Sequence, residues 1–351
     1  MKIYFVETEP SEQEFFVEAL PGHEVAFASK LDDVAADAEI LSTFINFRVE
    51  SAFLDAHPQL KLLSTRSTST DHLDLAALQD RGVSVACVMH YGETTVAEHT
   101  FALILALSRR LREVMNLAQS KRSFSYEATR GFDLSGKTIG IVGMGHVGRR
   151  VAKIAHGFQM NVIAHDLETP ADLPGKLDFE FVKLDDLLAR SDIITLHTTL
   201  SAENYHLLNR ETFGRCKRGV LIINTARGAL IDTEALREAL DSGQVGGAGL
   251  DVLQDERVLR DTASNIIAKN IVEHLRSDAL AHEALDAERV RELEELMLGD
   301  AVVKRMNVVF TPHLAFNSVE AVARRNAVTV ENIRAFLAGK MVDSVRGSAG
   351  K

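Results

Sequence analysis

A glycine-rich turn between a buried strand and a helix constrains this chain more than any other feature. Residues 138–142 are typical of a buried strand, and Gly143, Gly145 and Gly148 follow them. Gly143 permits a tight turn, Gly145 lets backbone N–H groups approach a pyrophosphate, and Gly148 lets the next helix pack close to the strand. The pattern therefore predicts a strand–turn–helix unit that binds a dinucleotide. The alternative is a glycine-rich turn of an α/β protein that binds no ligand.

An acidic residue at the end of the next apolar run indicates which dinucleotide the turn binds. Residues 160–165 form that run and Asp166 ends it, 18 residues after Gly148. A carboxylate at this place hydrogen-bonds the free 2′-hydroxyl of NAD and repels the 2′-phosphate of NADP. No Arg or Lys occurs in residues 167–170 to offset that repulsion. We therefore expect the cofactor to be NAD.

Strands and helices alternate along the whole chain, which predicts an α/β fold with parallel sheets. The length of 351 residues suggests two domains at about 150 residues each. The first series has expected strands at 2–6, 60–64 and 83–88, with helices at 11–20 and 73–81. The second has expected strands at 138–142, 160–165, 192–197, 220–224, 247–252 and 307–311. One long helix is expected over 95–119 and another over 318–339.

Residues 257–306 separate two strands and contain none themselves. Val290, Leu293, Leu296 and Met297 fall at helical spacing in a strongly charged background, so we expect a helical insertion. It is either a solvent-exposed surface segment without a specific role or a functional element, such as a lid or an oligomer contact.

Charge and composition exclude several classes of partner. The formal net charge of −11 disfavours a polyanion such as a nucleic acid. The longest apolar stretch, 101–107, is far shorter than a membrane span, and the first residues turn polar too soon for a signal peptide. The spacing of Cys87 and Cys216 fits no metal site. We expect a cytoplasmic protein without a metal centre.

Three further motifs follow strands of the second series, where open α/β sheets build their sites. Arg227 comes just after the run 220–224 and is suited to bind a carboxylate through two parallel hydrogen bonds. His313 follows another strand end and is a natural proton acceptor at neutral pH. Glu256 could raise the pKa of that histidine and fix its tautomer. Taken singly, each has a structural alternative: a surface ion-pair partner, a solvated acid, or a capping histidine.

Together these motifs resemble the D-isomer-specific 2-hydroxyacid dehydrogenase family. Asn-Thr-Ala-Arg227-Gly, Gly-Leu-Asp-Val followed by Glu256, and Thr-Pro-His313 match that family's Arg, Glu and His motifs in order. The likeness covers the chain except for 257–306 and implies two doubly wound parallel-sheet domains. The smaller, flavodoxin-like substrate domain would comprise residues 1–98 and 316–351. The Rossmann NAD-binding domain would comprise 99–315.

The resemblance also implies roles for individual residues. Arg227 would bind the substrate carboxylate and polarise the keto oxygen, while His313 exchanges the hydroxyl proton and Glu256 hydrogen-bonds His313. Asp255 is an adjacent alternative to Glu256. The residues that would hold the cofactor, beside the three glycines and Asp166, are His146, Val147, Thr198, Asn204, Thr225, Ala226 and Asp251.

Subfamily features resemble the D-lactate dehydrogenase branch. Backbone N–H groups near Thr68 and Ser69 would hold the substrate carboxylate, although the family usually has Gly in place of Ser69. Tyr91 would line the substrate pocket, or else it packs at an interface. The expected reaction is hydride transfer between NAD(H) and a small D-2-hydroxy acid, with D-lactate and pyruvate favoured, in a homodimer. The competing hypothesis is an NAD-sensing binding module with little or no catalysis.

Overall fold

The computed structural model describes residues 1–120, 125–127, 129–254 and 298–340. They form two compact units: unit 1 comprises residues 1–92 and 317–340, and unit 2 comprises the described residues between Glu93 and Phe316. The predicted first boundary, after residue 98, falls inside helix α4 (Glu93–Ser108), which belongs to unit 2 along its whole length. The predicted pair of doubly wound α/β domains is confirmed.

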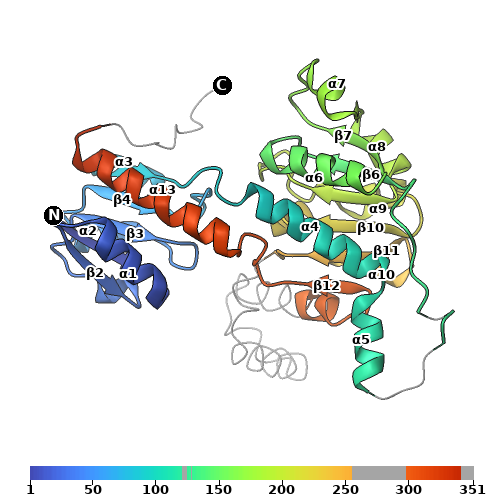
Figure 1. The fold of residues 1–351 in the computed structure, drawn as a ribbon, viewed down its shortest axis with the longest axis horizontal. Coiled ribbons are helices and arrows are strands. Elements are labelled where there is room, and N and C mark those ends of the chain that lie inside the picture. Colours follow the sequence, from blue (N-terminus) through green and yellow to red (C-terminus); the bar gives the residue numbers. More distant parts are fainter. Residues whose placement is uncertain (121–124, 128, 255–297, 341–351) are drawn as a thin grey trace, which may run out of the picture. The chain divides into compact units, whose positions relative to one another are not determined.

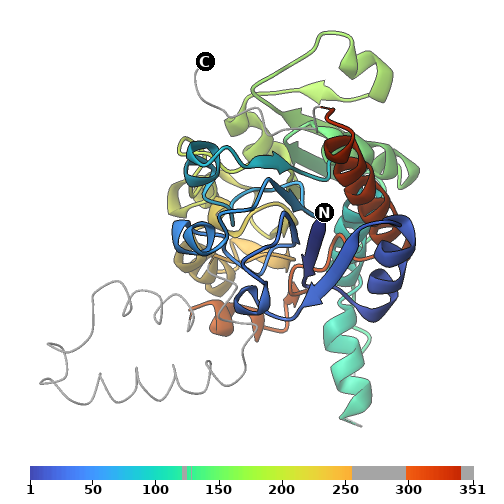
Figure 2. The same cartoon turned by 90° about the vertical axis from the view of Figure 1, so that its left-hand side faces the viewer.

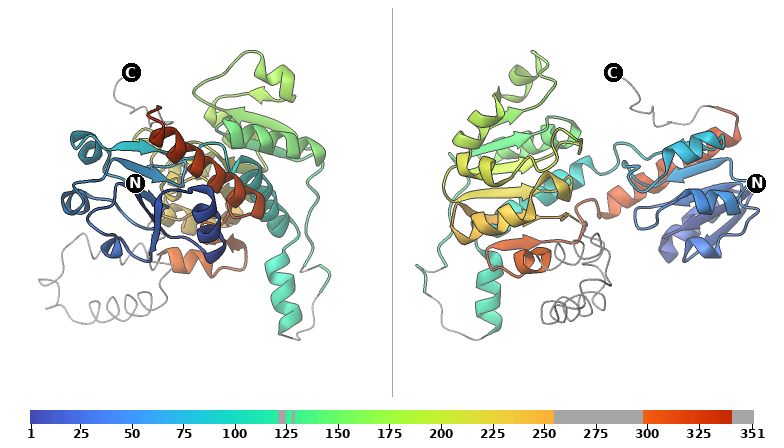
Figure 3. Two further views of the ribbon diagram at one scale, coloured as in Figure 1. Left: turned by 60° about the vertical axis from the view of Figure 1, so that its left-hand side comes forward. Right: turned by 180° about the vertical axis from the view of Figure 1, so that it is seen from behind.

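Unit 1 is a five-stranded parallel sheet with helices on both faces (Figures 1 and 3). Its strand order, β2-β1-β3-β4-β5, is the flavodoxin-like one. Helices α1 and α13 bury one face of the sheet, and α2 and α3 bury the other. The elements are β1 (Lys2–Val6), α1 (Pro10–Ala19), β2 (Glu24–Ala28), β3 (Ile40–Thr43), α2 (Ser51–Ala56), β4 (Leu62–Thr65), α3 (Leu75–Asp80), β5 (Ser84–Ala86) and α13 (Val319–Leu337).

Unit 2 is a seven-stranded parallel sheet in the order β12-β11-β10-β9-β6-β7-β8. The order reverses between β6 and β9, which makes a topological switch point of the doubly wound type. Helices α4 and α6 cover one face, and α8, α9 and α10 cover the other (Figure 1). The elements after α4 are α5 (Leu111–Gln119), β6 (Thr138–Val142), α6 (His146–Gly157), β7 (Asn161–His165), α7 (Leu173–Leu177), β8 (Glu180–Phe181), α8 (Leu184–Arg190), β9 (Ile193–Leu196), α9 (Arg210–Arg215), β10 (Val220–Asn224), α10 (Thr233–Asp241), β11 (Val245–Leu250) and β12 (Val308–Phe310).

The prediction of one continuous helix over 95–119 is wrong. Helix α4 ends at Ser108 and α5 begins at Leu111, because Arg110 adopts a left-handed conformation with φ 51°. A left-handed residue cannot continue a right-handed helix, so the chain changes direction there. Helix α5 contains no buried residue and leaves the body of unit 2 as a separate rod (Figure 2).

The expected insertion is described only at its end, where residues 298–303 are helical. Its preceding part, 257–297, lies outside the described residues. Among the helices that the structure describes, none is long and apolar enough to cross a lipid bilayer.

Candidate functional site

The strands of unit 2 present the predicted residues at one edge of the sheet. Parallel strands place their carboxyl ends together, and the loops that follow them build the site. The predicted residues at these strand ends are Gly143 after β6, Asp166 after β7, Thr198 after β9, Thr225 to Arg227 after β10, Asp251 after β11 and His313 after β12.

The glycine turn leaves room for a ligand at one of its three positions. A Cβ on Gly143, whose φ is 98°, would lie 2.6 Å from the carbonyl carbon of His197, and one on Gly148 would lie 2.0 Å from the carbonyl oxygen of Gly143. A Cβ on Gly145 would meet nothing within 4 Å. Gly145 precedes the first turn of α6, whose N–H groups receive no side-chain cap from it. An open helix N-terminus of this kind fits a pyrophosphate.

Asp166 lies directly against this turn. Its Oδ2 accepts a hydrogen bond from the backbone N–H of Met144 at 2.6 Å, and its Oδ1 accepts one from Glu168 at 3.2 Å. The side chain is half-buried at the end of β7. A carboxylate has about four lone-pair sites, so it keeps capacity for ribose hydroxyls. The position fits NAD as the sequence predicted.

The first turn of α6 carries the other predicted pyrophosphate residues, His146 and Val147. The imidazole Nδ1 of His146 lies 3.2 Å from the carboxylate of Glu93, and the guanidinium of Arg150 lies 3.3 Å from the same group. Glu93 therefore lies between Arg150 and His146 near the helix start, and the positive charge of Arg150 limits its repulsion of an anionic ligand.

The remaining predicted cofactor residues shape loops. Asn204 accepts a hydrogen bond from Ser201 and donates one to the carbonyl of Thr199 at 2.7 Å, so it closes the turn after β9. The hydroxyl of Thr225 lies 3.2 Å from that of Thr100 on α4.

The Arg227 loop is held by Asn224, a residue of the quoted motif to which the sequence assigned no role. Asn224 is fully buried, donates from its amide to the carbonyl of Arg227 at 2.9 Å and accepts from the N–H of Ala226 at 3.0 Å. A Cβ on Gly228 would lie 2.0 Å from the backbone of Leu253, so the loop after β10 packs on the loop after β11. The sequence could have indicated this role, because an asparagine at the end of a buried strand needs hydrogen-bond partners.

The loop after β12 presents His313 in a left-handed conformation, with φ 55°. Its N–H donates to the carbonyl of Asp251 at 2.7 Å, and the N–H of Asp251 donates to the carbonyl of Asn224 at 2.9 Å. Backbone hydrogen bonds therefore tie the ends of β10, β11 and β12 together. The carboxylate of Asp251 is buried and accepts from the N–H groups of Leu314 and Ala315 at 2.8 and 2.9 Å. The predicted acid Glu256 and its alternative Asp255 lie outside the described residues.

One histidine beside the glycine turn is held neutral. Burial lowers the pKa of His197 to about 3, and its Nε2 lies 2.8 Å from the hydroxyl of Thr195. Its backbone N–H donates to the carbonyl of Val142 at 2.7 Å, which fixes the strand end where the turn begins.

The predicted substrate residues of unit 1 lie on the loops after β4 and β5. The N–H of Ser69 donates to the hydroxyl of Ser67 at 3.0 Å, and the hydroxyl of Ser69 accepts from Asp71 at 3.1 Å. Thr68 lies between these two serines and is exposed. Tyr91 is 7% exposed, and its carbonyl accepts from Arg324 of α13. The serine side chains thus rigidify the loop that the sequence predicted to bind a carboxylate.

Buried charges lie behind this loop. Arg66 is fully buried and donates to the carbonyls of Val6 and Glu7 at 2.7 and 2.6 Å, and burial lowers its pKa to about 10. Burial tends to raise the pKa of Glu12, but the N–H of Glu9 and the guanidinium of Arg325 outweigh it and hold that pKa below its ordinary value. The carboxylates of Glu12 and Glu7 offset the charges of the Arg66 and Arg325 guanidiniums.

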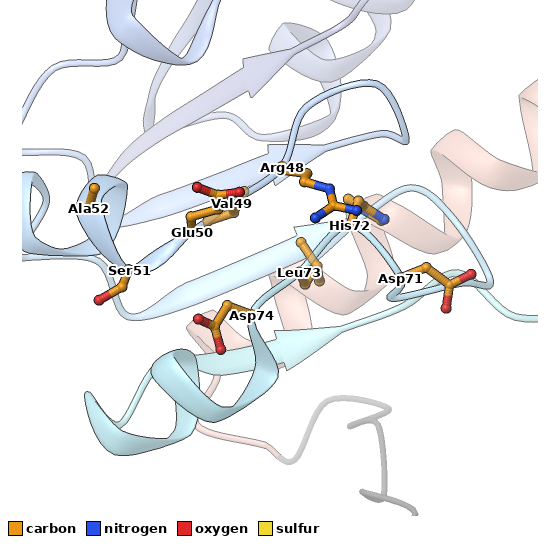
Figure 4. Close-up of a pocket in the computed structure, with 9 residues that line it drawn as sticks. All are labelled: Arg48, Val49, Glu50, Ser51, Ala52, Asp71, His72, Leu73 and Asp74. Atoms are coloured by element: carbon orange, nitrogen blue, oxygen red, sulfur yellow. The ribbon is translucent and has the colours of Figure 1, made fainter. Parts of the chain in front are cut away.

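A hollow of about 450 Å³ opens elsewhere in unit 1 (Figure 4). Arg48 and His72 lie together at one end, and Ser51 and Asp74 lie at the other (Figure 4). Its lining residues are Arg48, Val49, Glu50, Ser51, Ala52, Asp71, His72, Leu73 and Asp74. The lining carries three carboxylates and one guanidinium, so the hollow does not attract a substrate carboxylate.

Comparisons with known proteins agree with this geometry. The family model "D-isomer specific 2-hydroxyacid dehydrogenase, NAD binding domain" matches residues 101–269. A 2-hydroxyacid dehydrogenase homolog of Haemophilus influenzae is 34% identical over 317 residues, which cover 89% of this chain and 87% of that protein. The D-lactate dehydrogenase of Escherichia coli is 33% identical, over 78% of this chain and 74% of that protein.

Solved structures resemble the whole fold. The D-lactate dehydrogenase of Aquifex aeolicus, solved with NAD and lactic acid, has a TM-score of 0.79 and 30% identity, with 96% of each chain covered. A pyruvate reductase of Chlamydomonas reinhardtii has a TM-score of 0.81 and 28% identity, with 98% of each chain covered.

Proposed function

The chain belongs to the D-isomer-specific 2-hydroxyacid dehydrogenase family, and on that premise we propose that its substrates are D-lactate and pyruvate. It is an NAD-dependent oxidoreductase. When bound, NAD(H) supplies the hydride acceptor or donor. The similarity to D-lactate dehydrogenases supports this substrate pair.

The proposal depends on one observation: the Arg227 and His313 loops are both fixed by hydrogen bonds at the same edge of the sheet. Asn224 fixes the backbone of Arg227, and Asp251 fixes the backbone of His313, at the same sheet edge as the glycine turn. The guanidinium of Arg227 binds the substrate carboxylate in a forked geometry and draws electron density from the C2 oxygen. His313 accepts the proton of the C2 hydroxyl during oxidation and returns it during reduction. Glu256 hydrogen-bonds His313 in this proposal.

The other site residues bind and orient. Gly143, Gly145, His146, Val147 and Gly148 would hold the pyrophosphate, and Asp166 the adenosine ribose. Residues Thr198, Asn204, Thr225, Ala226 and Asp251 would contact the rest of the cofactor. In unit 1, backbone N–H groups near Thr68 and Ser69 would bind the substrate carboxylate, and Tyr91 would line the substrate pocket.

A panel of 2-keto acids tests the proposal. NADH absorbance is followed with pyruvate, glyoxylate and branched longer acids, and the product of each reaction is resolved on a chiral column. We expect pyruvate to give the highest kcat/KM and D-lactate to be the product. A higher kcat/KM for a longer acid contradicts the proposed substrate. NADH binding without turnover of any acid would favour the binding-module hypothesis.

We also propose that a second copy of the chain covers α5. Leu111, Val114 and Met115 are 44%, 38% and 59% exposed on this helix, and apolar residues so exposed mark an interaction surface. Light scattering should give a dimer mass for the parent. Met115→Glu should shift the mass toward the monomer, whereas Val17→Glu, a matched change at an exposed valine of α1, should not. A monomeric parent contradicts this proposal.

A cytoplasmic location fits the two thiols. Cys87 and Cys216 are buried and free, and burial raises the pKa of each to about 11. Thiols held in the neutral form react slowly with oxidants and disulfides. We therefore place the protein in a reducing compartment; detection only in an exported cell fraction would contradict this.

A further inference from the structure

A chain of three side chains lies behind the His313 loop, and the roles proposed above include neither His99 nor Thr311. The hydroxyl of Thr311 donates to Oδ1 of Asp251 at 2.6 Å. The imidazole Nε2 of His99, on α4, lies 2.9 Å from the same hydroxyl and 3.6 Å from Oδ1 of Asp251. All three residues belong to unit 2.

The geometry fixes where the protons are. A threonine hydroxyl has one proton, and Thr311 gives it to the carboxylate of Asp251. The hydroxyl oxygen must therefore accept the proton of His99, which requires that the Nε2 atom carries hydrogen. The hydrogen bonds run from His99 to Thr311 to Asp251, and each donor has its acceptor.

Helix packing explains why His99 reaches this place. His99, Leu103 and Leu107 are spaced four residues apart and so share one face of α4. A Cβ on Gly249 would lie 2.9 Å from Cβ of Leu103, and one on Gly247 would lie 3.2 Å from a methyl group of Leu107. The two glycines thus let α4 lie on β11 with its leucines over the strand. One turn earlier, the same face presents His99 beside Asp251.

Asp251 transmits this restraint to the loop that carries His313. Its carboxylate accepts from the N–H groups of Leu314 and Ala315, and its carbonyl accepts from the N–H of His313. His313 is held at a positive φ of 55°, a conformation that a non-glycine residue keeps only when its surroundings impose it. The loop therefore depends on the orientation of the Asp251 carboxylate.

We propose that His99 and Thr311 are positioning residues that fix the Asp251 carboxylate and, through it, the direction of the His313 imidazole. The catalytic part of this inference rests on the proposed role of His313 as the base. Their removal shifts the imidazole without touching the cofactor turn at Gly145, which lies after β6. The consequence is a fall in kcat that exceeds any loss of NADH affinity, since Asp251 is itself a proposed cofactor contact.

Two matched pairs of variants test the proposal. Thr311→Val removes the hydroxyl and keeps the shape, and Thr311→Ser keeps the hydroxyl. His99→Leu removes the donor, and His99→Gln offers a side-chain N–H at similar reach. We expect Thr311→Val and His99→Leu to lower kcat about 10- to 100-fold, the size of a small misplacement of a catalytic group. The Ser and Gln variants should recover most of it, and in every variant the Kd for NADH should change less than kcat does.

A control and a second readout separate the possible failures. His156→Leu removes another hydrogen-bonded imidazole of unit 2, whose Nε2 lies 2.7 Å from the carbonyl of Leu177, and should leave kcat unchanged. The rate of amide hydrogen exchange at Leu314 and Ala315 measures how well the Asp251 carboxylate anchors this loop, and it does not depend on turnover. If the parent reduces no 2-keto acid, the proposed function fails, and faster exchange in Thr311→Val but not Thr311→Ser still supports the anchor. Parent-level kcat in folded Thr311→Val and His99→Leu, or exchange at the parent rate, overturns the inference.

Discussion

The carboxylate of Asp166 accepts a hydrogen bond of 2.6 Å from the backbone N–H of Met144. The bond joins the end of β7 to the glycine turn after β6, so the acid expected to bind the ribose also stiffens the turn expected to bind the pyrophosphate. The ends of β6 and β7 therefore hold the proposed pyrophosphate-binding and ribose-binding groups in fixed relative positions.

The variant Asp166→Ala should weaken NADH binding and reduce the preference for NADH over NADPH. The substitution removes both the ribose acceptor and the charge that repels a 2′-phosphate. Each hydrogen bond to a charged group is worth about 1.5–3 kcal/mol, so we expect a loss of NADH affinity of roughly ten-fold or more. Fluorescence titration with both cofactors measures it. An unchanged NADH/NADPH ratio of Kd values would count against the ribose role.

A methyl group at Gly145 should weaken cofactor binding without lowering the stability of the protein. The variant Gly145→Ala places its Cβ in open space at φ −68°, which alanine adopts without strain, so the melting temperature should not fall. The same methyl group blocks the approach of a pyrophosphate to the helix N-terminus, so NADH binding should weaken strongly. Gly175→Ala, also in open space, is the control for both measurements. Parent-level NADH affinity in Gly145→Ala would refute the pyrophosphate site.

Replacing the proposed base should abolish turnover and spare the cofactor. His313→Ala removes the group that exchanges the hydroxyl proton, and general-base catalysis is commonly worth about 10²–10⁴ in rate. Pyruvate reduction and NADH fluorescence measured on the same preparation report the two effects. Turnover near the parent rate would show that another group carries the proton.

Acid should destabilise the protein partly through His197. Its pKa is about 3 in the folded protein against 6.5 ordinarily, because the buried ring resists protonation. The unfolded chain therefore binds a proton that the folded protein does not, and the free energy of unfolding falls as the pH drops from about 6.5 toward 3. Above pH 6.5 this contribution is constant.

The variant His197→Asn should lessen that pH dependence. Urea unfolding of both proteins between pH 7 and 5 avoids the range in which Glu12, with its lowered pKa, begins to lose its own contribution below about 4.5. Equal slopes of unfolding free energy against pH in the two proteins would argue that the ring of His197 is accessible to protons.

Sequence periodicity predicted the strands that carry the chemistry. The runs at 138–142 and 220–224 match β6 and β10, because both strands are buried on two faces and read as continuous apolar segments. Strands β2, β3 and β8 were missed: β2 is only half-buried, β3 mixes Ser42 and Thr43 into a buried run, and β8 has two residues. The break at Arg110 was also missed, since it depends on a backbone conformation that no residue type there demands.

The sequence by itself determined the parallel α/β fold, the dinucleotide turn and the strand ends that Arg227 and His313 follow, because each follows from local spacing of glycines, apolar runs and polar strand ends. Only the tertiary structure decided which groups support them. Asn224 looks ordinary in the sequence and holds near neighbours, whereas His99 and Thr311 are distant in sequence from Asp251 and meet it because helix packing and strand order bring separate segments together. Hydrogen bonds act over about 3 Å, so such partners are defined by the folded chain and not by any pattern along it.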